Sequence, residues 1–319
     1  MRKLFLGAAI ILGWLLVNNT YSQFYVAKLK SDTIPVSMHE NHLYREIERK
    51  AEKYETAPID ARIDPVWKAI PGYNGLKVDL EKSYRKMKKS GKYSQDKLVL
   101  EQVSPKVHLG NLPPAAIYKG NQEKPMVSFV INVAWGNEYL SDMLATLKKH
   151  NVQATFFMEG RWVKNNPSLA KMIVSAGHEA GNHSFSHPKM ERLSAAKANE
   201  EIKKTNAIIE TTTGKVCRWF SPPSGGYRDE TVKVAAANGL GTIMWSVDTI
   251  DWQKPDPQTL INRVTTKVHS GALILMHPTE STAKSLDRLI TEMEKRNLEI
   301  GTVSELLDEE RIMTKITKK

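Results

Sequence analysis

The chain has 319 residues, of which 41% are hydrophobic and 25% charged, with 46 lysines and arginines against 35 aspartates and glutamates. These fractions are typical of a globular protein and exclude a disordered chain or a multi-span membrane protein. The net charge is +11, but the sequence has no stretch of basic residues interleaved with aromatic ones, no zinc finger and no helix-turn-helix pattern. We therefore expect no nucleic acid as partner. Anionic wall polymers or lipid headgroups of a cell envelope account for the positive charge equally well.

The start of the chain has the pattern of an export signal. Arg2 and Lys3 precede a continuous apolar run at 4–17, and a polar stretch that contains Thr20 and Ser22 follows it. Such a run after positive charges is typical of a signal peptide, and it is shorter than the roughly 17–25 residues of a membrane span. We predict a signal peptide or membrane anchor over residues 1–22, and a location outside the cytoplasm.

The next hundred residues divide into two regions by composition. Residues 23–57 are polar and charged, which predicts a stalk or a solvated helix. Residues 58–124 are rich in turn signals and predict a small region with a helix at 81–89 and strands at 98–103 and 107–109.

A regular alternation of strands and helices then occupies residues 125–307, and a basic tail follows at 308–319. The predicted strands are 127–133, 154–158, 178–184, 218–222, 242–247, 273–276 and 300–303, and the predicted helices are 139–150, 167–176, 194–212, 229–238, 257–268 and 283–295. Short buried strands that alternate with helices predict an α/β fold with a parallel sheet. Seven repeats favour a barrel-like closure, in which functional side chains gather at the carboxyl ends of the strands.

Chemically versatile residues do stand at these strand ends. His183 and His187 follow the third strand, and two histidines four residues apart can point at one metal ion. Asp248, Asp251 and Trp252 follow the fifth strand. Each of them alone also fits capping or turn chemistry.

The ends of the fourth and sixth strands carry further candidates. Pro222 and Pro223 follow the fourth strand, and His277 follows the sixth. The sequence therefore predicts that all these residues line one site. Cys217, the single cysteine, cannot form an intramolecular disulfide and is predicted to be a small buried apolar residue.

The motifs HSFSH at 183–187, SPPSG at 221–225, DTIDW at 248–252 and LMHP at 275–278 occur in that order, after ATFF at 154–157. This order resembles the polysaccharide deacetylase family, the NodB homology domain of carbohydrate esterase family 4. The resemblance covers about 127–307 and implies a distorted (β/α) barrel of seven or eight strands. Residues 60–124 resemble a spore-associated subgroup of endospore-forming bacilli, which implies sporulation, at the cell envelope or forespore, as the setting.

Enzymes of this family remove N-acetyl, sometimes O-acetyl, groups from peptidoglycan or chitin-like polymers. A metal held by one aspartate and two histidines polarises the carbonyl and activates water, an aspartate is the base, and a late histidine protonates the leaving amine. The resemblance implies that His183 and His187 bind the metal and that His277 is the acid. It also implies that Asp251 orients His277 and that Trp252 forms the wall beside it.

The first motif of the family is changed in this chain. Where the family reads Thr-Phe-Asp-Asp-Gly, this chain has Asn132 at the place of the base and Val133 at that of the metal-binding aspartate. Asparagine cannot take up a proton near neutral pH and valine has no donor atom, so zinc is expected to be weakly bound or absent. Ser221 replaces the arginine that would pair with the base, so that no buried charge is left without its partner. Ser224 stands where a tyrosine is usual.

Two functions fit this pattern. One is a deacetylase of cell-wall or spore-cortex peptidoglycan, or a related glycan, in which another carboxylate such as Asp248 or Glu138 reaches the site. The other is a catalytically impaired pseudoenzyme that binds wall glycan or scaffolds envelope proteins. The histidines at 183, 187 and 277 and the aspartate at 251 favour a retained site, but mutual hydrogen bonding would also explain their presence.

Overall fold

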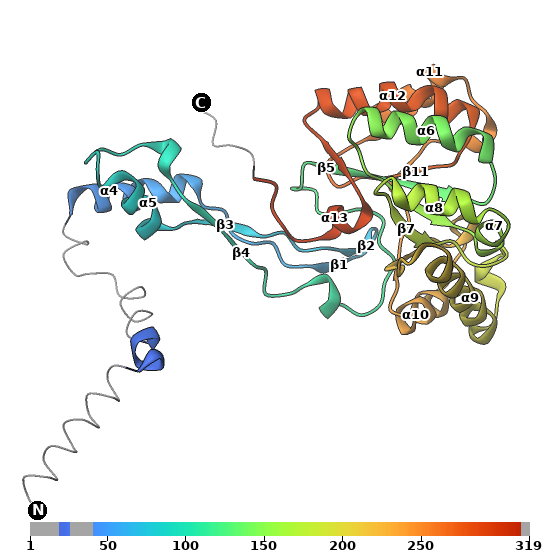
Figure 1. Cartoon of the computed structure of the whole chain (residues 1–319), viewed down its shortest axis with the longest axis horizontal. Helices are drawn as coiled ribbons and strands as arrows, with labels where there is room; N and C mark the ends of the chain where they lie inside the picture. Colours follow the sequence, from blue (N-terminus) through green and yellow to red (C-terminus); the bar gives the residue numbers. More distant parts are fainter. Residues whose placement is uncertain (1–18, 26–40, 314–319) are drawn as a thin grey trace, which may run out of the picture. The chain divides into compact units, whose positions relative to one another are not determined.

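The computed structural model describes residues 19–25 and 41–313, which belong to two compact units (Figure 1). The first contains the described residues before Ala57 together with 76–101, and the second contains 57–75 and 102–313. The region predicted at 58–124 thus contributes to both units. Residues 1–18 of the predicted signal peptide lie outside the described residues. None of the helices in the described ranges is long and apolar enough to cross a membrane.

The first unit is built around two short amphipathic helices, α4 (His42–Ala51) and α5 (Leu80–Met87). One face of α4 buries Leu43, Ile47 and Ala51, which pack with apolar side chains of the unit in a small core of its own. The stalk predicted at 23–57 therefore contains, in its described part, a helix with a buried face. The other elements of this part of the chain are the 3₁₀ helices η1 (Glu52–Tyr54) and η2 (Gln95–Lys97) and the paired strands β3 (Gly75–Val78) and β4 (Leu100–Val103).

The second unit contains a parallel sheet curled into a half-barrel, which confirms the prediction of an α/β fold with a barrel-like parallel sheet. Its strands follow the order β10-β11-β5-β6-β7-β8-β9, and β12 pairs with the start of β5. They are β5 (Met126–Val133), β6 (Thr155–Met158), β7 (Glu179–Asn182), β8 (Trp219–Phe220), β9 (Gly241–Thr242), β10 (Val247–Asp248), β11 (Leu273–Met276) and β12 (Glu299–Gly301). All carboxyl ends meet at one edge, because every pairing is parallel.

Six helices lie close to their predicted positions and cover the outside of this sheet (Figure 1). They are α6 (Asn137–Lys149), α8 (Pro167–Ser175), α9 (Ala195–Thr213), α10 (Asp229–Ala237), α11 (Pro257–Lys267) and α12 (Glu280–Lys295). Several begin at side-chain caps and one ends at a left-handed glycine, as at Ser194 and Gly214 around α9. Two short helices, α7 (Gly160–Asn165) and α13 (Val303–Leu307), were not predicted.

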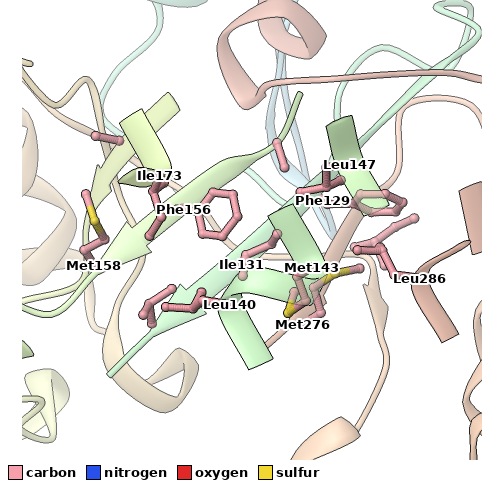
Figure 2. Close-up of a cluster of buried hydrophobic side chains, with 14 of the residues drawn as sticks. Phe129, Ile131, Leu140, Met143, Leu147, Phe156, Met158, Ile173, Met276 and Leu286 are labelled. Atoms are coloured by element: carbon pink, nitrogen blue, oxygen red, sulfur yellow. The ribbon is translucent and has the colours of Figure 1, made fainter. Parts of the chain in front are cut away.

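Strand β5 shows how the sheet separates two apolar layers. Phe129 and Ile131 face the helices in the larger core, where Figure 2 shows Ile131 beside Leu140 and Met143 of α6 and Phe129 beside Leu147. Val130 instead belongs to a second cluster inside the curl of the sheet. Alternate residues of a strand point to opposite faces, so a strand buried on both sides reads as the continuous apolar run seen here.

The strand predicted at 242–247 is divided in the structure. Its start forms β9 and its end forms β10, which are the two opposite ends of the sheet order. The residues between them, 243–246, cross from one end of the sheet to the other. An unbroken apolar run hid this division, because periodicity cannot locate a change of direction.

An extended segment at 116–120, which we call the seam segment, runs between the end of β9 and the residues directly before β11. Ile117 donates to Thr242 O (2.9 Å) and accepts from Met244 N (2.8 Å), while Gly120 donates to Gly271 O (2.8 Å). A Cβ on Gly271, whose φ is +83°, would lie 2.9 Å from Gly120 O, so glycine permits this approach. The barrel is therefore closed by hydrogen bonds from outside its strand order.

Three other boundaries differ from the predictions. The predicted strand at 107–109 does not form, and Leu109 begins the 3₁₀ helix η3 (Leu109–Asn111) instead. Strand β7 ends at Asn182, which leaves His183 in the following loop. The strand predicted at 300–303 gives way to α13 after Gly301. The remaining strands, β1 (Arg62–Asp64) and β2 (Lys68–Ile70), form an antiparallel pair before the barrel.

Two side chains in the core of the second unit are notable for their buried ionisable groups. Cys217 is buried, which raises the pKa of its thiol to about 12, so it is inert as predicted. His178 packs on Phe156 with ring centroids 5.0 Å apart, and its Nδ1 accepts from Ala154 N (3.2 Å). Burial lowers the pKa of His178 to about 4.

This histidine makes stability depend on pH. Since its pKa is lower in the folded chain, the unfolded chain binds more protons below about pH 6.5, and stability is lost as pH falls. The free energy of unfolding of the native protein should fall between pH 7 and pH 5. We expect this fall to be about 2 kcal/mol smaller in the His178→Gln variant. Urea denaturation at both pH values measures this difference, and His42→Gln, at an exposed position, is the matched control. Parallel pH profiles of all three proteins would contradict the prediction.

Candidate functional site

A cavity of about 470 Å³ opens at the carboxyl ends of the strands. Its walls are Asn132, Ala134, Trp135, His183, His187, Ser224, Trp245, Asp248, Trp252, Leu275 and His277. Six of the nine predicted site residues therefore meet in one cavity. The other three, Asp251, Pro222 and Pro223, are buried and do not line it.

The two histidines that follow β7 lie against each other in this cavity. Their ring centroids are 5.1 Å apart, in an edge-to-face arrangement. His183 is almost fully buried, and its Nδ1 donates to Ser221 O (2.7 Å), which leaves the lone pair on Nε2. Burial and the neighbouring His187 lower the pKa of His183 to about 3, so this ring is neutral at physiological pH. A neutral imidazole with its other nitrogen fixed is the form that binds metals.

The loop that carries these histidines is held in a strained shape by the protein itself. Ser184 and His187 have φ values of +59° and +54°, which residues other than glycine rarely adopt. The Glu201 carboxylate on α9 accepts from Ser186 N (2.8 Å) and from the Ser186 hydroxyl (2.8 Å), and Arg161 Nη2 donates to Ser186 O (2.5 Å). Glu201 and Arg161 belong to no motif, which is why the sequence did not reveal their part in the site.

On the opposite wall, His277 is fixed by a completely buried carboxylate. Asp251 Oδ1 lies 2.8 Å from His277 Nδ1, while Oδ2 accepts from His277 N (2.5 Å) and from the Thr282 hydroxyl (2.6 Å). Nδ1 therefore carries the proton shared with Asp251, and Nε2 is directed at the cavity. This geometry is the one expected of an oriented acid.

Trp135 covers the His277 ring, a contact that the sequence analysis did not foresee. The two rings are stacked, with centroids 5.7 Å apart and planes inclined by 10°, and 47% of Trp135 remains exposed. The next residue, Gly136, has a φ of +81°, and a Cβ there would lie 1.9 Å from Pro278 O. Only glycine allows the two loops to meet so closely, and this brings Trp135 onto His277. The tryptophan directly after the changed first motif was the available signal.

The two changed residues at the end of β5 point in different directions. Asn132 lines the cavity, and its buried Oδ1 has no hydrogen-bond partner in the described part of the chain, as is also true of Ser221 Oγ. Val133 is fully buried in the apolar core between sheet and helices and does not line the cavity. Neither residue offers a base or a metal ligand to the site.

The donor atoms present do not fit the metal site of the family. Over the described ranges, no group of three or more histidine, cysteine, aspartate or glutamate side chains could hold a metal ion. Asp248 shares the cavity with the histidines, but its Oδ1 accepts from Ile250 N (2.8 Å). Glu138 lines a neighbouring cavity instead. Neither carboxylate supplies the ligand that replaces the missing aspartate.

Comparison with known proteins places these observations in a family. Residues 119–243 match the model of the family described as polysaccharide deacetylase. The uncharacterized protein YlxY of Bacillus subtilis is 53% identical over 298 residues, which cover 93% of each chain. The peptidoglycan-N-acetylmuramic acid deacetylase PdaA of Bacillus subtilis is 30% identical over 199 residues, which cover 61% of this chain and 76% of PdaA.

Among solved structures, the chain is similar to BA3943 of Bacillus anthracis, described as a CE4 family pseudoenzyme. The identity is 54% and the TM-score 0.80, over 85% of this chain and 96% of that one. A mutant of BA3943 described as having restored enzymatic activity matches at 53% identity with the same TM-score, over 85% of this chain and 99% of that one. With this fold, these motifs and these relatives, the chain belongs to the polysaccharide deacetylase family, carbohydrate esterase family 4.

Proposed function

We propose that this protein is a catalytically impaired deacetylase homologue that binds N-acetylated wall glycan, of peptidoglycan or chitin type, in the cavity at the strand ends. The observation that carries the proposal is the contrast between the two halves of this cavity. The wall with His277, Trp135 and Trp252 is complete and open, whereas the end of β5 offers the amide of Asn132 and no ligand at Val133.

The missing groups predict very slow deacetylation. Loss of a general base removes a factor of about 10²–10⁴ in rate. Loss of a metal ligand adds to this, because the loss of even an outer partner lowers metal affinity or activity about 10–100-fold. His277 can still act as a proton donor. Without an activated water to attack the acetyl carbonyl, however, no leaving amine forms to accept that proton. Zinc is therefore expected to be weakly bound or absent in the native protein.

The retained walls suit a sugar. Trp135 and Trp252 are 47% and 57% exposed, and each offers a flat apolar face beside polar atoms. Pyranose rings present C–H faces and hydroxyl edges, which match such a mixed surface, and small-molecule sites are commonly apolar with a few oriented polar groups. Relatives named as peptidoglycan and chitooligosaccharide deacetylases support an N-acetylated glycan as the ligand.

The setting of this activity belongs to the same proposal. An export signal over residues 1–22, an envelope or forespore location and a role in sporulation rest on the N-terminal pattern and on the resemblance of residues 60–124. The barrel domain at 125–307 would be the glycan-binding part, with the stalk, the region before the barrel and the tail at 308–319 as accessory segments. The formal charge of +11 supports contact with anionic wall or membrane polymers.

Binding to purified peptidoglycan, and to chitooligosaccharides by calorimetry, tests the proposal. We expect the native protein to bind and Trp135→Ala or Trp252→Ala to weaken binding roughly 2- to 10-fold each, as loss of an aromatic contact predicts. Met172→Ala, at an exposed apolar position on α8, is the matched control and should bind as the native protein does. Absence of glycan binding would refute the proposal. Acetate release at the rate of family enzymes would establish the deacetylase alternative.

A further inference from the structure

A cavity of about 400 Å³ lies at the amino ends of two strands of the sheet, away from the cavity at the strand carboxyl ends. It is lined by residues of α6, by the end of α8 and by the loops that lead into β6 and β7. Among the described residues, none lines both cavities. The volume falls within the range of small-molecule sites, and we call this space the helix cavity.

His178 presents an unused hydrogen-bond donor to the helix cavity. The residue lines the cavity although only 5% of it is exposed. Its Nδ1 accepts from Ala154 N, and burial lowers the pKa of the ring to about 4, so the ring is neutral and its one proton is on Nε2. In the described part of the chain this N–H has no acceptor. A buried donor without a partner is costly, so a ligand that brings an acceptor is favoured there.

Three further side chains supply donors to the same cavity. Lys148, Asn151 and Gln153 line it, and no other described residue forms a hydrogen bond or ion pair with their side chains. Gln153 lies close to the histidine loop, because a Cβ on Gly177 would be 3.1 Å from Gln153 Nε2. No aspartate or glutamate is among the described residues that line the cavity. One cation and several N–H donors without a carboxylate favour an anionic ligand.

The helix ends at this cavity do not use up these donors. Asn151, with a φ of +54°, closes α6, and Val152 N then donates to Leu147 O (2.9 Å). Gly177, with a φ of +90°, closes α8, where its N donates to Val174 O (3.0 Å). Backbone bonds therefore occupy carbonyls of both last turns. The negative ends of the helix dipoles oppose an anion, but this effect is confined to the last turn and screened, whereas the donor of the histidine loop is buried.

The remaining surface of the helix cavity is apolar. Leu144 and Ala145 of α6 and Val152 of the following loop line it. Burial of each CH₂ group of a ligand against such a surface strengthens binding about fourfold. An inorganic anion would leave this surface uncovered, so the lining suits an anion that carries a short apolar tail.

We propose that the helix cavity binds a small monocarboxylate with a short apolar tail, whose carboxylate accepts from His178 Nε2 and from the side chains of Lys148 and Gln153. Two sources share this chemistry, a free carboxylic acid and the C-terminal residue of a peptide. The site is separate from the cavity at the strand carboxyl ends and does not depend on glycan binding.

Nuclear magnetic resonance of the full chain with ¹⁵N-labelled histidine tests the site. Hexanoate and N-acetyl-dialanine are the two probes, and the His178→Gln variant identifies the signal of His178. We expect hexanoate to move the Nε2 signal of His178 to a saturating new position. Hexanol, which has the same tail without the charge, should bind at least tenfold more weakly, because a hydrogen bond to a charged acceptor is lost.

A lysine variant tests the charge. Lys148→Met should weaken hexanoate binding about two- to fivefold, as expected for an exposed ion pair. Lys171→Met, at an exposed position of α8 outside the cavity, is the matched control and should bind as the native protein does. Tighter binding of hexanoate than of N-acetyl-dialanine would identify a free acid as the ligand class, and the reverse order would identify a peptide end.

Three results would overturn the proposal. They are a His178 signal that neither carboxylate moves, a hexanoate affinity no greater than that of hexanol, and an unchanged hexanoate affinity in Lys148→Met. Each would mean that the unused donor of His178 is satisfied by solvent alone. Binding of chitooligosaccharides is measured separately and should not respond to hexanoate, so the failure of this site and the failure of the proposed function are distinguishable.

Discussion

The double variant Asn132→Asp, Val133→Asp is expected to bind zinc with one ion per chain and to release acetate from N-acetylated oligosaccharides at least 100-fold faster than the native protein. The first change restores a base beside the cavity, which is worth about 10²–10⁴ in rate. The second places a carboxylate at the position of the family's metal ligand, and its side chain must turn from the apolar core toward the two histidines to reach the ion. His183 is already neutral and oriented, so the base and the metal-ligand position that are missing both lie at the end of β5.

The structure also predicts what this variant loses. Val133 is packed among apolar side chains, so a carboxylate there is buried without a partner until a metal arrives. We expect the zinc-free double variant to unfold at a lower temperature than the native protein, and zinc to reverse most of the loss, because a ligand of the folded state stabilises it.

Thermal unfolding with and without zinc, and acetate release, measure both effects. The single variants are expected to remain near the native rate, and adding His183→Ala to the double variant should abolish both the zinc response and the activity. A double variant without any zinc-dependent shift in its unfolding temperature would show that Val133 does not stand in the place of the metal ligand.

Replacing Lys124 by methionine is expected to lower the free energy of unfolding by about 1–3 kcal/mol. The Lys124 side chain is 2% exposed, and its Nζ donates to Glu305 O, to Asp308 O (3.1 Å) and to Asp308 Oδ1 (2.6 Å). It thus donates to carbonyls at the end of α13. Its positive charge also interacts favourably with the negative C-terminal end of the helix dipole. Methionine keeps the apolar stem but takes this donor away from Glu305 O, Asp308 O and the Asp308 carboxylate, which is 46% exposed.

Urea denaturation measures this difference. The matched control is Lys203→Met, at an exposed position of α9, which is expected to change stability by no more than about 0.5 kcal/mol. Equal stability of the two variants would show that the Lys124 contacts are not needed to hold the end of the chain to the barrel.

The sequence predicted the repeating part of the fold well and its closure poorly. Strand β5 and helix α6 can be predicted from the sequence, because burial of one or both faces of an element fixes the spacing of its apolar residues. The seam segment at 116–120 carries no such period, since its role is to supply backbone hydrogen bonds. The division of 242–247 was missed for a related reason, because both halves are apolar.

The candidate site shows the same contrast. His183 and His277 were found because their motifs occur in a fixed order along the chain, and both line the cavity. Asp251 was assigned as the partner of His277, and the structure places its carboxylate 2.8 Å from that ring. Trp135 was not found because its place over His277 depends on how loops from different repeats approach one another, and Glu201 was not found because its contact with Ser186 comes from α9, outside any motif. Such contacts are tertiary and leave no local pattern.

The seam segment makes one part of the barrel depend on a few backbone hydrogen bonds. Elsewhere in the second unit neighbouring strands pair directly, whereas β9 and the start of β11 are joined, in the described part of the chain, by the hydrogen bonds of Ile117 and Gly120, by the crossing residues 243–246 and by the bond from Ser246 N to Leu273 O (3.1 Å). Amide protons at Ile117 and Met244 should therefore exchange with solvent faster than those of β5, since local opening of this joint needs no global unfolding.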